Sequence, residues 1–316
     1  MIKKLIKILS IVFLLVISVV LYLTIVGVKT EKFNKKIIDK ISKINKKINL
    51  DLKDVKFILD PYNFKINVIT KNSEVLIEGT KLKIKEIKTD ISLKPLIFNE
   101  FSLDDLQIST NYIKLEDLIL LARYLKNSTQ LFLLDRLIKD GSLAADINLK
   151  FDEKGNIKKD YQVTGHIKNV KLNFLNKVRA SDLNLEFEIK KNKYSLMKAK
   201  GVVNKIKLSS PLFEIYQKKD QFSIKGKILT DKQEFNRNQL SMMSDIFLND
   251  LNIEKVRFNS ENNIYFNISK KLKIKDIDIR SKINLNQLVI KNDLISLKSY
   301  LPNLKEVIDF QKHKIT

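Results

Sequence analysis

Hydrophobic residues fill one unbroken stretch close to the N-terminus. From Ile8 to Val28 the chain has twenty-one residues without a charge, and a helix of that length spans about 31 Å, close to the ~30 Å hydrocarbon core of a bilayer. The apolar region of a cleaved signal peptide is shorter and ends at small residues, whereas this stretch continues to Lys29. A buried core helix fits poorly, because the segment is apolar on all sides and bracketed by lysines. We predict a retained transmembrane helix over residues 8–28, after a tail of residues 1–7.

A second apolar pattern, with the period of an α-helix, follows the predicted span. Its members are separated by four, four, three and four positions amid lysines: Phe33, Ile37, Ile41, Ile44 and Ile48. We predict a neck helix with one apolar stripe. Two placements fit this stripe, one on the membrane surface and one across the end of the following sheet.

From about residue 50 the hydrophobic period changes to two, which is typical of strands with one wet face. Two runs carry the signal: Tyr62, Phe64, Ile66 and Val68, and then Leu82 and Ile84 followed by Ile87, Thr89, Ile91 and Leu93. The second run changes phase after Ile84, which predicts a bulge or a strand break there. The same change of phase occurs in a short echo of residues 81–87 at residues 271–277. In so lysine-rich a chain the echo is a weak indication of an internal repeat.

A helical interlude separates two groups of predicted strands. It runs from Leu115 to Ile138, pauses at residues 127–129, and is expected to stop at Gly141. The second group of strands covers residues 145–151, 163–167, 183–189 and 222–228, with turns at residues 152–156 and 190–193. We therefore expect the neck helix and a first β domain over residues 29–140, and a repeated-strand β domain over residues 141–316.

Composition argues against a nucleic-acid partner in spite of a formal net charge of +23. Only six of the 59 basic residues are arginine, and the lysines are spread along the chain, whereas bidentate phosphate and base contacts favour clustered arginine. The excess of lysine, isoleucine and asparagine is typical of coding by an AT-rich genome. We read most lysines as solvated strand faces, and those beside the span as suited to anionic headgroups.

The chain contains few residues of the types that usually carry out catalysis or bind cofactors. The chain has no cysteine, its seven glycines form no phosphate loop, and its two histidines, His166 and His313, have no ligand-spaced partner. Two acidic pairs occur, at residues 104–105 and 116–117. Neighbours on a strand point apart, and acids at a helix start complement the helix dipole. We expect no enzymatic activity, no cofactor, no metal site and no small-molecule substrate.

An extended antiparallel sheet with one apolar face must hide that face in a sandwich, against a partner, or under an apolar ligand. In the third case the sheet curls into an open trough, where about fifteen strands at ~4.7 Å each would line roughly 70 Å of apolar surface. We expect a mainly β fold with a few helices. The groove candidates are the apolar positions of the strongest strands: Tyr62, Phe64, Ile66, Val68, Ile147, Leu149, Leu183, Leu185, Phe187, Phe222 and Ile224.

Several segments resemble the N-terminal region of AsmA-like proteins. After the basic tail, span and neck, the similar segments are residues 63–68, 79–84, 91–96 and 101–108, and residues 161–170 resemble the strand pattern of the YhdP and TamB branch. The resemblance implies an elongated, taco-like β-groove that binds membrane phospholipid and assists its transport from the inner to the outer membrane of Gram-negative bacteria. It also implies other envelope proteins as partners. Members of that branch are several times longer, so we expect a fragment or a shortened copy, truncated at its C-terminus.

The resemblance also implies a topology, with the N-terminus in the cytoplasm and the bulk domain in the periplasm. A literal count of positive charges on the two sides of the span would reverse this topology, because eight lysines follow the span between Lys29 and Lys47. Long domains translocate largely regardless of charge, however, so we keep the periplasmic assignment. Two alternatives stay open: a structural scaffold for envelope assembly, and a lipopolysaccharide-handling subunit similar to LptC.

Overall fold

The computed structural model describes most of the chain and organises it into two compact units. The described residues are 2–31, 34, 38, 48–53, 55–77, 80–93, 103–125, 128–152, 158–174, 178–237, 239, 253–269, 271, 273–291 and 307–315. Unit 1 comprises Met1–Leu131 and Leu143–Gly165, and unit 2 comprises Phe132–Ser142 and His166–Thr316. The chain is mainly β, with an N-terminal apolar helix and a large antiparallel sheet that is not closed into a barrel. These features of the predicted fold class are confirmed.

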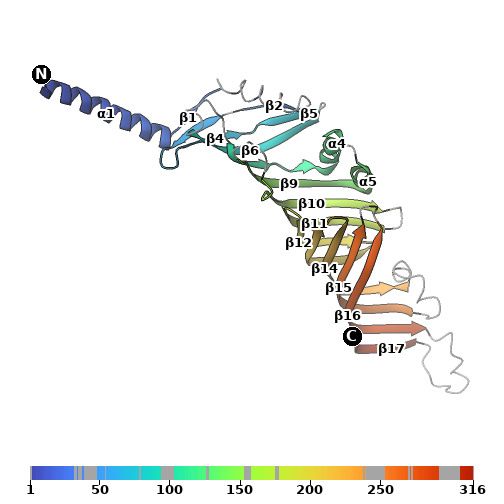
Figure 1. Cartoon of the computed structure of the whole chain (residues 1–316). Coiled ribbons are helices and arrows are strands. Elements are labelled where there is room, and N and C mark those ends of the chain that lie inside the picture. The colour runs from blue at the N-terminus through green and yellow to red at the C-terminus, as the bar shows by residue number, and fades with distance from the viewer. Residues whose placement is uncertain are drawn as a thin grey trace, which may run out of the picture. The chain divides into compact units, whose positions relative to one another are not determined.

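Helix α1 (Ile2–Ile25) leads almost directly into the sheet of unit 1 (Figure 1). Its segment Ile6–Ile25 is long and apolar enough to cross a membrane, by length and composition, and none of that segment is buried in the protein. The predicted span was wrong at its end, because the helix ends at Ile25 and Val28 begins strand β1 (Val28–Lys29). Gly27 allows the helix to end at this point. Its φ is +72°, and a Cβ there would lie 2.5 Å from the carbonyl oxygen of Phe57.

The sheet of unit 1 is antiparallel throughout. Its strands are β2 (Ile48–Asp51), β3 (Lys56–Asp60), β4 (Lys65–Lys71), β5 (Glu74–Ile77), β6 (Thr80–Ser92), β7 (Leu103–Thr110), β8 (Ile113–Lys114) and part of β9 (Ile138–Lys150). One ladder runs β1, β3, β4, β6, β7, β9, and a second runs β2, β5, β6. β6 belongs to both ladders: its residues 80–83 pair with β5 and its residues 86–92 pair with β4. Between these two parts, at Ile84 and Glu86, its register against β7 shifts. The predicted change of phase at this point is therefore confirmed.

The helical interlude is present as α4 (Leu115–Leu125) and α5 (Thr129–Leu137). The predicted pause is confirmed at Ser128, whose Oγ accepts a hydrogen bond from the Leu131 N–H at 3.3 Å and so caps α5. The predicted stop at Gly141 was wrong. α5 ends at Leu137, and Gly141 lies inside β9, where its φ of 132° suits a glycine in a strand rather than a helix cap.

Unit 2 is an antiparallel meander in which each strand pairs with the next along the chain. After β10 (Gln162–Phe174), which contributes residues to both units, come β11 (Val178–Lys190), β12 (Lys193–Val203), β13 (Ile206–Gln217), β14 (Gln221–Asn236), β15 (Ile253–Ser269), β16 (Ile274–Lys291) and β17 (Val307–Ile315). The predicted turn between β11 and β12 is confirmed at residues 191–192. β16 has one extra residue relative to β15 near Asp276, whose φ is +51°. The second predicted change of phase is confirmed there.

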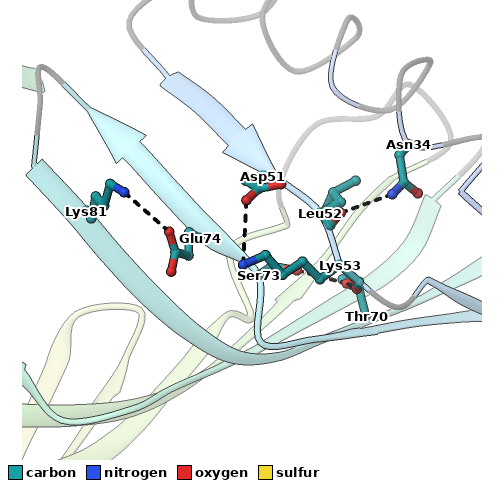
Figure 2. Close-up of polar contacts among 8 residues, drawn as sticks. All are labelled: Asn34, Asp51, Leu52, Lys53, Thr70, Ser73, Glu74 and Lys81. Atoms are coloured by element: carbon teal, nitrogen blue, oxygen red, sulfur yellow. Dashed lines mark hydrogen bonds and ion pairs between the residues drawn. The ribbon is translucent and has the colours of Figure 1, made fainter.

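The predicted neck helix and the predicted turn at residues 152–156 fall largely outside the described residues. Of the neck stripe only Ile48 is described, and it is a strand residue that starts β2. Nearby, Asn34 donates a hydrogen bond from Nδ2 to the Leu52 carbonyl at 3.0 Å, as Figure 2 shows. Ile38 packs against the buried cluster around Val55.

Candidate functional site: the apolar faces of the sheet

Strand register gathers the apolar side chains of unit 1 on one face, because residues opposite each other on neighbouring strands point to the same side. We call this the unit 1 apolar face. One row is Phe57, Val68, Thr89, Leu106 and Leu149, and the next is Thr70, Ile87, Ile108 and Ile147. Ile66 lies opposite Leu59 and Ile91 on the same face. Of the groove candidates in this unit, the structure thus brings together Ile66, Val68, Ile147 and Leu149.

One corner of the unit 1 apolar face is closed by a packed cluster. Val55 is 1% exposed and forms a buried cluster with Val68, Leu50 and Leu52. The polar groups beside the cluster are paired: the Thr70 hydroxyl donates to the Lys53 carbonyl and lies 2.8 Å from the Ser73 hydroxyl (Figure 2). Val68 is therefore part of a core, whereas the rows through Leu106, Ile108, Ile147 and Leu149 are only half-buried.

Tyr62 and Phe64 were predicted as strand residues, and this prediction was wrong. They lie in the turn of residues 61–64 between β3 and β4, with 93% and 57% of their surface exposed. The physical reason is local. Pro61 carries no backbone N–H, and the Asp60 carboxylate accepts hydrogen bonds from Asn63, which together favour a turn over a continuous strand.

Unit 2 has an apolar face that crosses six strands, β11 to β16. Its first row, chained by strand register, is Phe187, Leu196, Phe213, Gly226, Ile264 and Ile279. Its second row is Ile189, Tyr194, Ile215, Ile224 and Phe266. We call these rows and their alternating neighbours the unit 2 apolar face. The candidates Leu183, Leu185, Phe187, Phe222 and Ile224 all belong to it.

This face is open along much of its length. Phe187 is buried, but Leu196, Phe213, Ile224, Ile264 and Phe266 are half-buried, and on β16 Ile274, Ile277 and Ile279 are 58%, 63% and 57% exposed. A Cβ on Gly226 would lie 2.2 Å from the Phe213 ring, so that ring covers the glycine and flattens the surface. At about 4.8 Å between strands, the first row, which crosses six strands, is roughly 24 Å long, and the second, which crosses five, is roughly 19 Å long.

A packed cluster closes the unit 2 face beyond a register shift of β14 between Thr230 and Gln233. Phe235 is 1% exposed and stacks on Phe258, with ring centroids 4.8 Å apart. Ile206 and Val256 are the other buried members. Each unit therefore combines a packed hydrophobic cluster with an apolar surface that the described residues leave partly open.

The opposite face of unit 2 is charged and self-paired. Glu214 contacts Lys193 at 2.6 Å and Lys225 at 2.9 Å, and the Tyr216 ring lies 5.5 Å and 5.3 Å from the two ammonium groups. The hydrogen bond from Lys193, followed by that from Lys225, lowers the pKa of Glu214 to about 2. An open hollow of about 550 Å³ nearby is lined by charges of both signs, including Lys227, Asp278 and Arg280, and by apolar groups such as Leu212. The paired charges of this face favour contact with water.

We expect Glu214→Gln to lower the free energy of unfolding by about 1–2 kcal/mol at neutral pH, less than the whole pKa shift implies, because both lysines stay about half exposed. Since the folded-state pKa lies below the ordinary value of 4.5, this stabilisation is present above pH 4.5 and lost as the pH falls toward 2. Denaturant titrations at both ends of that range measure it. Glu186→Gln, at a more exposed pair with Lys198, is the control and should cost under about 0.5 kcal/mol. Equal losses in the two variants would contradict the expectation.

The sequence-predicted chemical candidates are not brought together into a centre. His166 lies on β10, and Glu116 and Asp117 lie in the first turn of α4, as a helix dipole favours. Asp105 accepts a hydrogen bond from the Asp90 N–H at 3.3 Å. In the part of the chain that the structure describes, no group of three or more histidine, aspartate or glutamate residues is placed to hold a metal ion.

Sequence reasoning missed the contribution of β12, β13, β15 and β16 to the unit 2 apolar face. The alternation on these strands is interrupted where the backbone bulges, at Lys198 with φ +51° on β12 and between Ser209 and Phe213 on β13. Each bulge moves the next side chain to the other face. A search that permitted one slip per strand would have found these rows.

Comparison with protein-family models, curated proteins and solved structures gives no significant match for this chain. The resemblance to AsmA-like proteins therefore stays a prediction from sequence pattern.

Proposed function

We propose that this chain is a membrane-anchored, AsmA-like protein that binds phospholipid acyl chains on the apolar faces of its sheet. In this proposal α1 spans the inner membrane with the N-terminus in the cytoplasm, and the β units lie in the periplasm. There they assist the movement of lipid toward the outer membrane. The role is binding and transfer, without catalysis.

The observation that carries the proposal is the partly open unit 2 apolar face. Monomeric soluble proteins rarely expose contiguous apolar surface of this kind, and such surface marks a binding site for a partner, a ligand or a membrane. Rows of about 19 and 24 Å exceed the ~15 Å of one leaflet of a ~30 Å hydrocarbon core, so a whole acyl chain fits along either row. Exposed Ile274, Ile277 and Ile279 are aliphatic positions where such a chain would exclude water.

The chemistry of the two sides of the sheet favours an acyl chain over a polar ligand. Among the side chains of the two rows of the unit 2 apolar face, the only polar group is the Tyr194 hydroxyl. This hydroxyl donates a hydrogen bond to the Gln217 side chain at 3.1 Å. The charged groups lie on the other side, where they pair with each other. A hydrocarbon chain needs contact area and no hydrogen-bond partners, which is what these rows offer.

The packed clusters favour a second candidate for part of the chain. Around Val55 and around Phe235 the apolar side chains already bury one another, as in a structural scaffold. We assign these clusters to holding the sheet in shape, and the open rows to lipid.

Native mass spectrometry of the full chain, purified from cells with isotope-labelled phospholipid, tests the proposal. We expect at least one phospholipid per chain beyond the number carried by a peptide of residues 1–27, which controls for lipid held by α1 alone. A folded full chain that carries no more lipid than this peptide would leave the scaffold role as the better account.

A further inference from the structure

The turn between β3 and β4 points back toward the end of α1. β1 pairs antiparallel with β3, so that Val28 lies opposite Phe57 and Lys29 opposite Lys56. Since β1 leads away from α1, β3 runs back toward it, and the two are in contact. From Phe57 to Asp60 the strand advances about 10 Å in that direction. The turn of residues 61–64, which follows β3 directly, therefore lies close to the C-terminal end of α1.

This turn presents two aromatic side chains to solvent on a rigid frame. Tyr62 is 93% exposed and Phe64 is 57% exposed. The Asp60 carboxylate accepts hydrogen bonds from the Asn63 side chain at 2.8 Å and from the Asn63 backbone N–H at 3.0 Å, which lower the pKa of Asp60. On the other side, the Leu93 N–H donates to the Phe64 carbonyl at 2.9 Å. The aromatic pair is thus held in place before it meets a ligand.

Phe64 occupies a backbone position that normally belongs to glycine or asparagine. Its φ is +52°, and a bulky residue in this left-handed region costs about 1–2 kcal/mol. Burial does not offset that cost, because more than half of the side chain is exposed. Among the nine described non-glycine residues with a positive φ, Phe64 is the only apolar one, which makes it a candidate for a functional contact.

The level of the turn matches a membrane interface. The apolar segment of α1 ends at Ile25, and Tyr22, 55% exposed, lies in its last turn. Tyrosine is enriched at membrane–water interfaces, where its ring sits among the headgroups. Lys29 and Lys56 follow on the water side, paired across β1 and β3, and suit anionic headgroups.

We propose that the β3–β4 turn inserts Tyr62 and Phe64 into the interface of the membrane that α1 spans. This inference rests on the membrane placement of α1 in the proposed function. It adds a second contact that fixes unit 1 against the bilayer. Because Phe57 lies opposite Val28 and belongs to the unit 1 apolar face, the turn also brings the first row of that face to the bilayer surface.

Depth-dependent fluorescence quenching in the full chain tests the inference. The chain contains no cysteine, so single variants Tyr62→Cys, Tyr112→Cys and Ile17→Cys each accept one environment-sensitive fluorophore. Tyr112 is the matched control: it is 49% exposed and follows β7 at the end of the sheet opposite to the turn, where Thr110 pairs with Ile84. Each labelled chain is reconstituted into phosphatidylcholine–phosphatidylglycerol nanodiscs that contain lipids spin-labelled near the headgroup or deep in the acyl chain.

We expect fluorescence at position 62 to be lost with the headgroup-proximal quencher, fluorescence at position 17 with the deep quencher, and fluorescence at position 112 with neither. Loss at position 17 without loss at position 62 would overturn the insertion of the turn and leave the anchor intact. No loss at position 17 would overturn the membrane placement of α1, and this inference with it. Equal loss at positions 62 and 112 would also overturn the inference, because it would indicate contact of the whole unit with lipid.

Discussion

Replacing Ile279 with glutamate is expected to reduce phospholipid binding by the unit 2 apolar face about a hundredfold, because a charge placed among acyl chains costs about 3 kcal/mol. Ile279 ends the first row of that face and is 57% exposed, so the change removes little packing. The measurement is the number of phospholipids retained per chain in native mass spectra, compared over a series of detergent concentrations.

Arg280→Glu provides the matched control for Ile279→Glu. Arg280 is the next residue on β16, points to the opposite face, and has an 81% exposed side chain. The Arg280→Glu variant therefore places a glutamate on the same strand, but on the face that we assign to water. We expect unchanged lipid retention. Arg280→Glu also removes a positive charge, so it changes the net charge more than Ile279→Glu does. If Arg280→Glu loses as much lipid as Ile279→Glu or more, binding depends on net charge rather than on the apolar face, and the assignment of the face is wrong.

Phe235→Ala is expected to lower the free energy of unfolding of unit 2 by about 3 kcal/mol, toward the lower end of the range for buried phenylalanine, because its buried neighbours are few. Phe235 is 1% exposed and stacks on Phe258, beside Ile206 and Val256. Denaturant unfolding of the full chain, followed by circular dichroism, measures the loss.

Phe222→Ala controls for the loss of a phenylalanine as such. Phe222 lies on the open part of the same strand and is half-buried, so its removal should cost only about 1 kcal/mol. We also expect Phe235→Ala to keep its lipid under conditions where the variant stays folded, because that side chain is already covered by protein. A larger stability loss at Phe222 than at Phe235 would contradict the division into packed and open regions.

Much of the fold was predictable because strands of a sheet with one face in water alternate apolar and polar residues along the sequence. The alternation at Leu183, Leu185 and Phe187, and again at Phe222 and Ile224, predicted strands that the structure contains. Even the two changes of phase, after Ile84 and near Asp276, were readable, since inserting one residue moves the following side chains to the other face.

The turn at residues 61–64 could not be predicted by alternation alone. Tyr62 and Phe64 continue the apolar phase of Ile66 and Val68, so pattern matching extended β4 through them. What decides the structure is local chemistry: Pro61 withholds a backbone donor, and Asp60 binds Asn63. Two candidates for the groove thereby became candidates for the membrane interface.

Gly141 illustrates a different limit of sequence reasoning. A glycine after an apolar helical pattern predicts a helix end, yet α5 ends at Leu137 and β9 begins at Ile138. β9 is fixed by pairing with β10 and, over Asp146–Lys150, with β7, where Ile147 lies opposite Ile108. Pairing of this kind joins residues far apart in the sequence, so the residues around Gly141 do not predict it.

Mapping where phospholipid contacts the sheet tests the proposed lipid binding by the apolar faces. The full chain is reconstituted with a phospholipid that carries a photoactivatable group in its acyl chain, irradiated, and digested for peptide mass spectrometry. We expect adducts on α1 and on the unit 2 apolar face, at positions such as Ile224, Ile264 and Phe266, with neighbouring Lys225 and Tyr265 unmodified. Adducts confined to α1, or spread equally over both faces of the sheet, would contradict it.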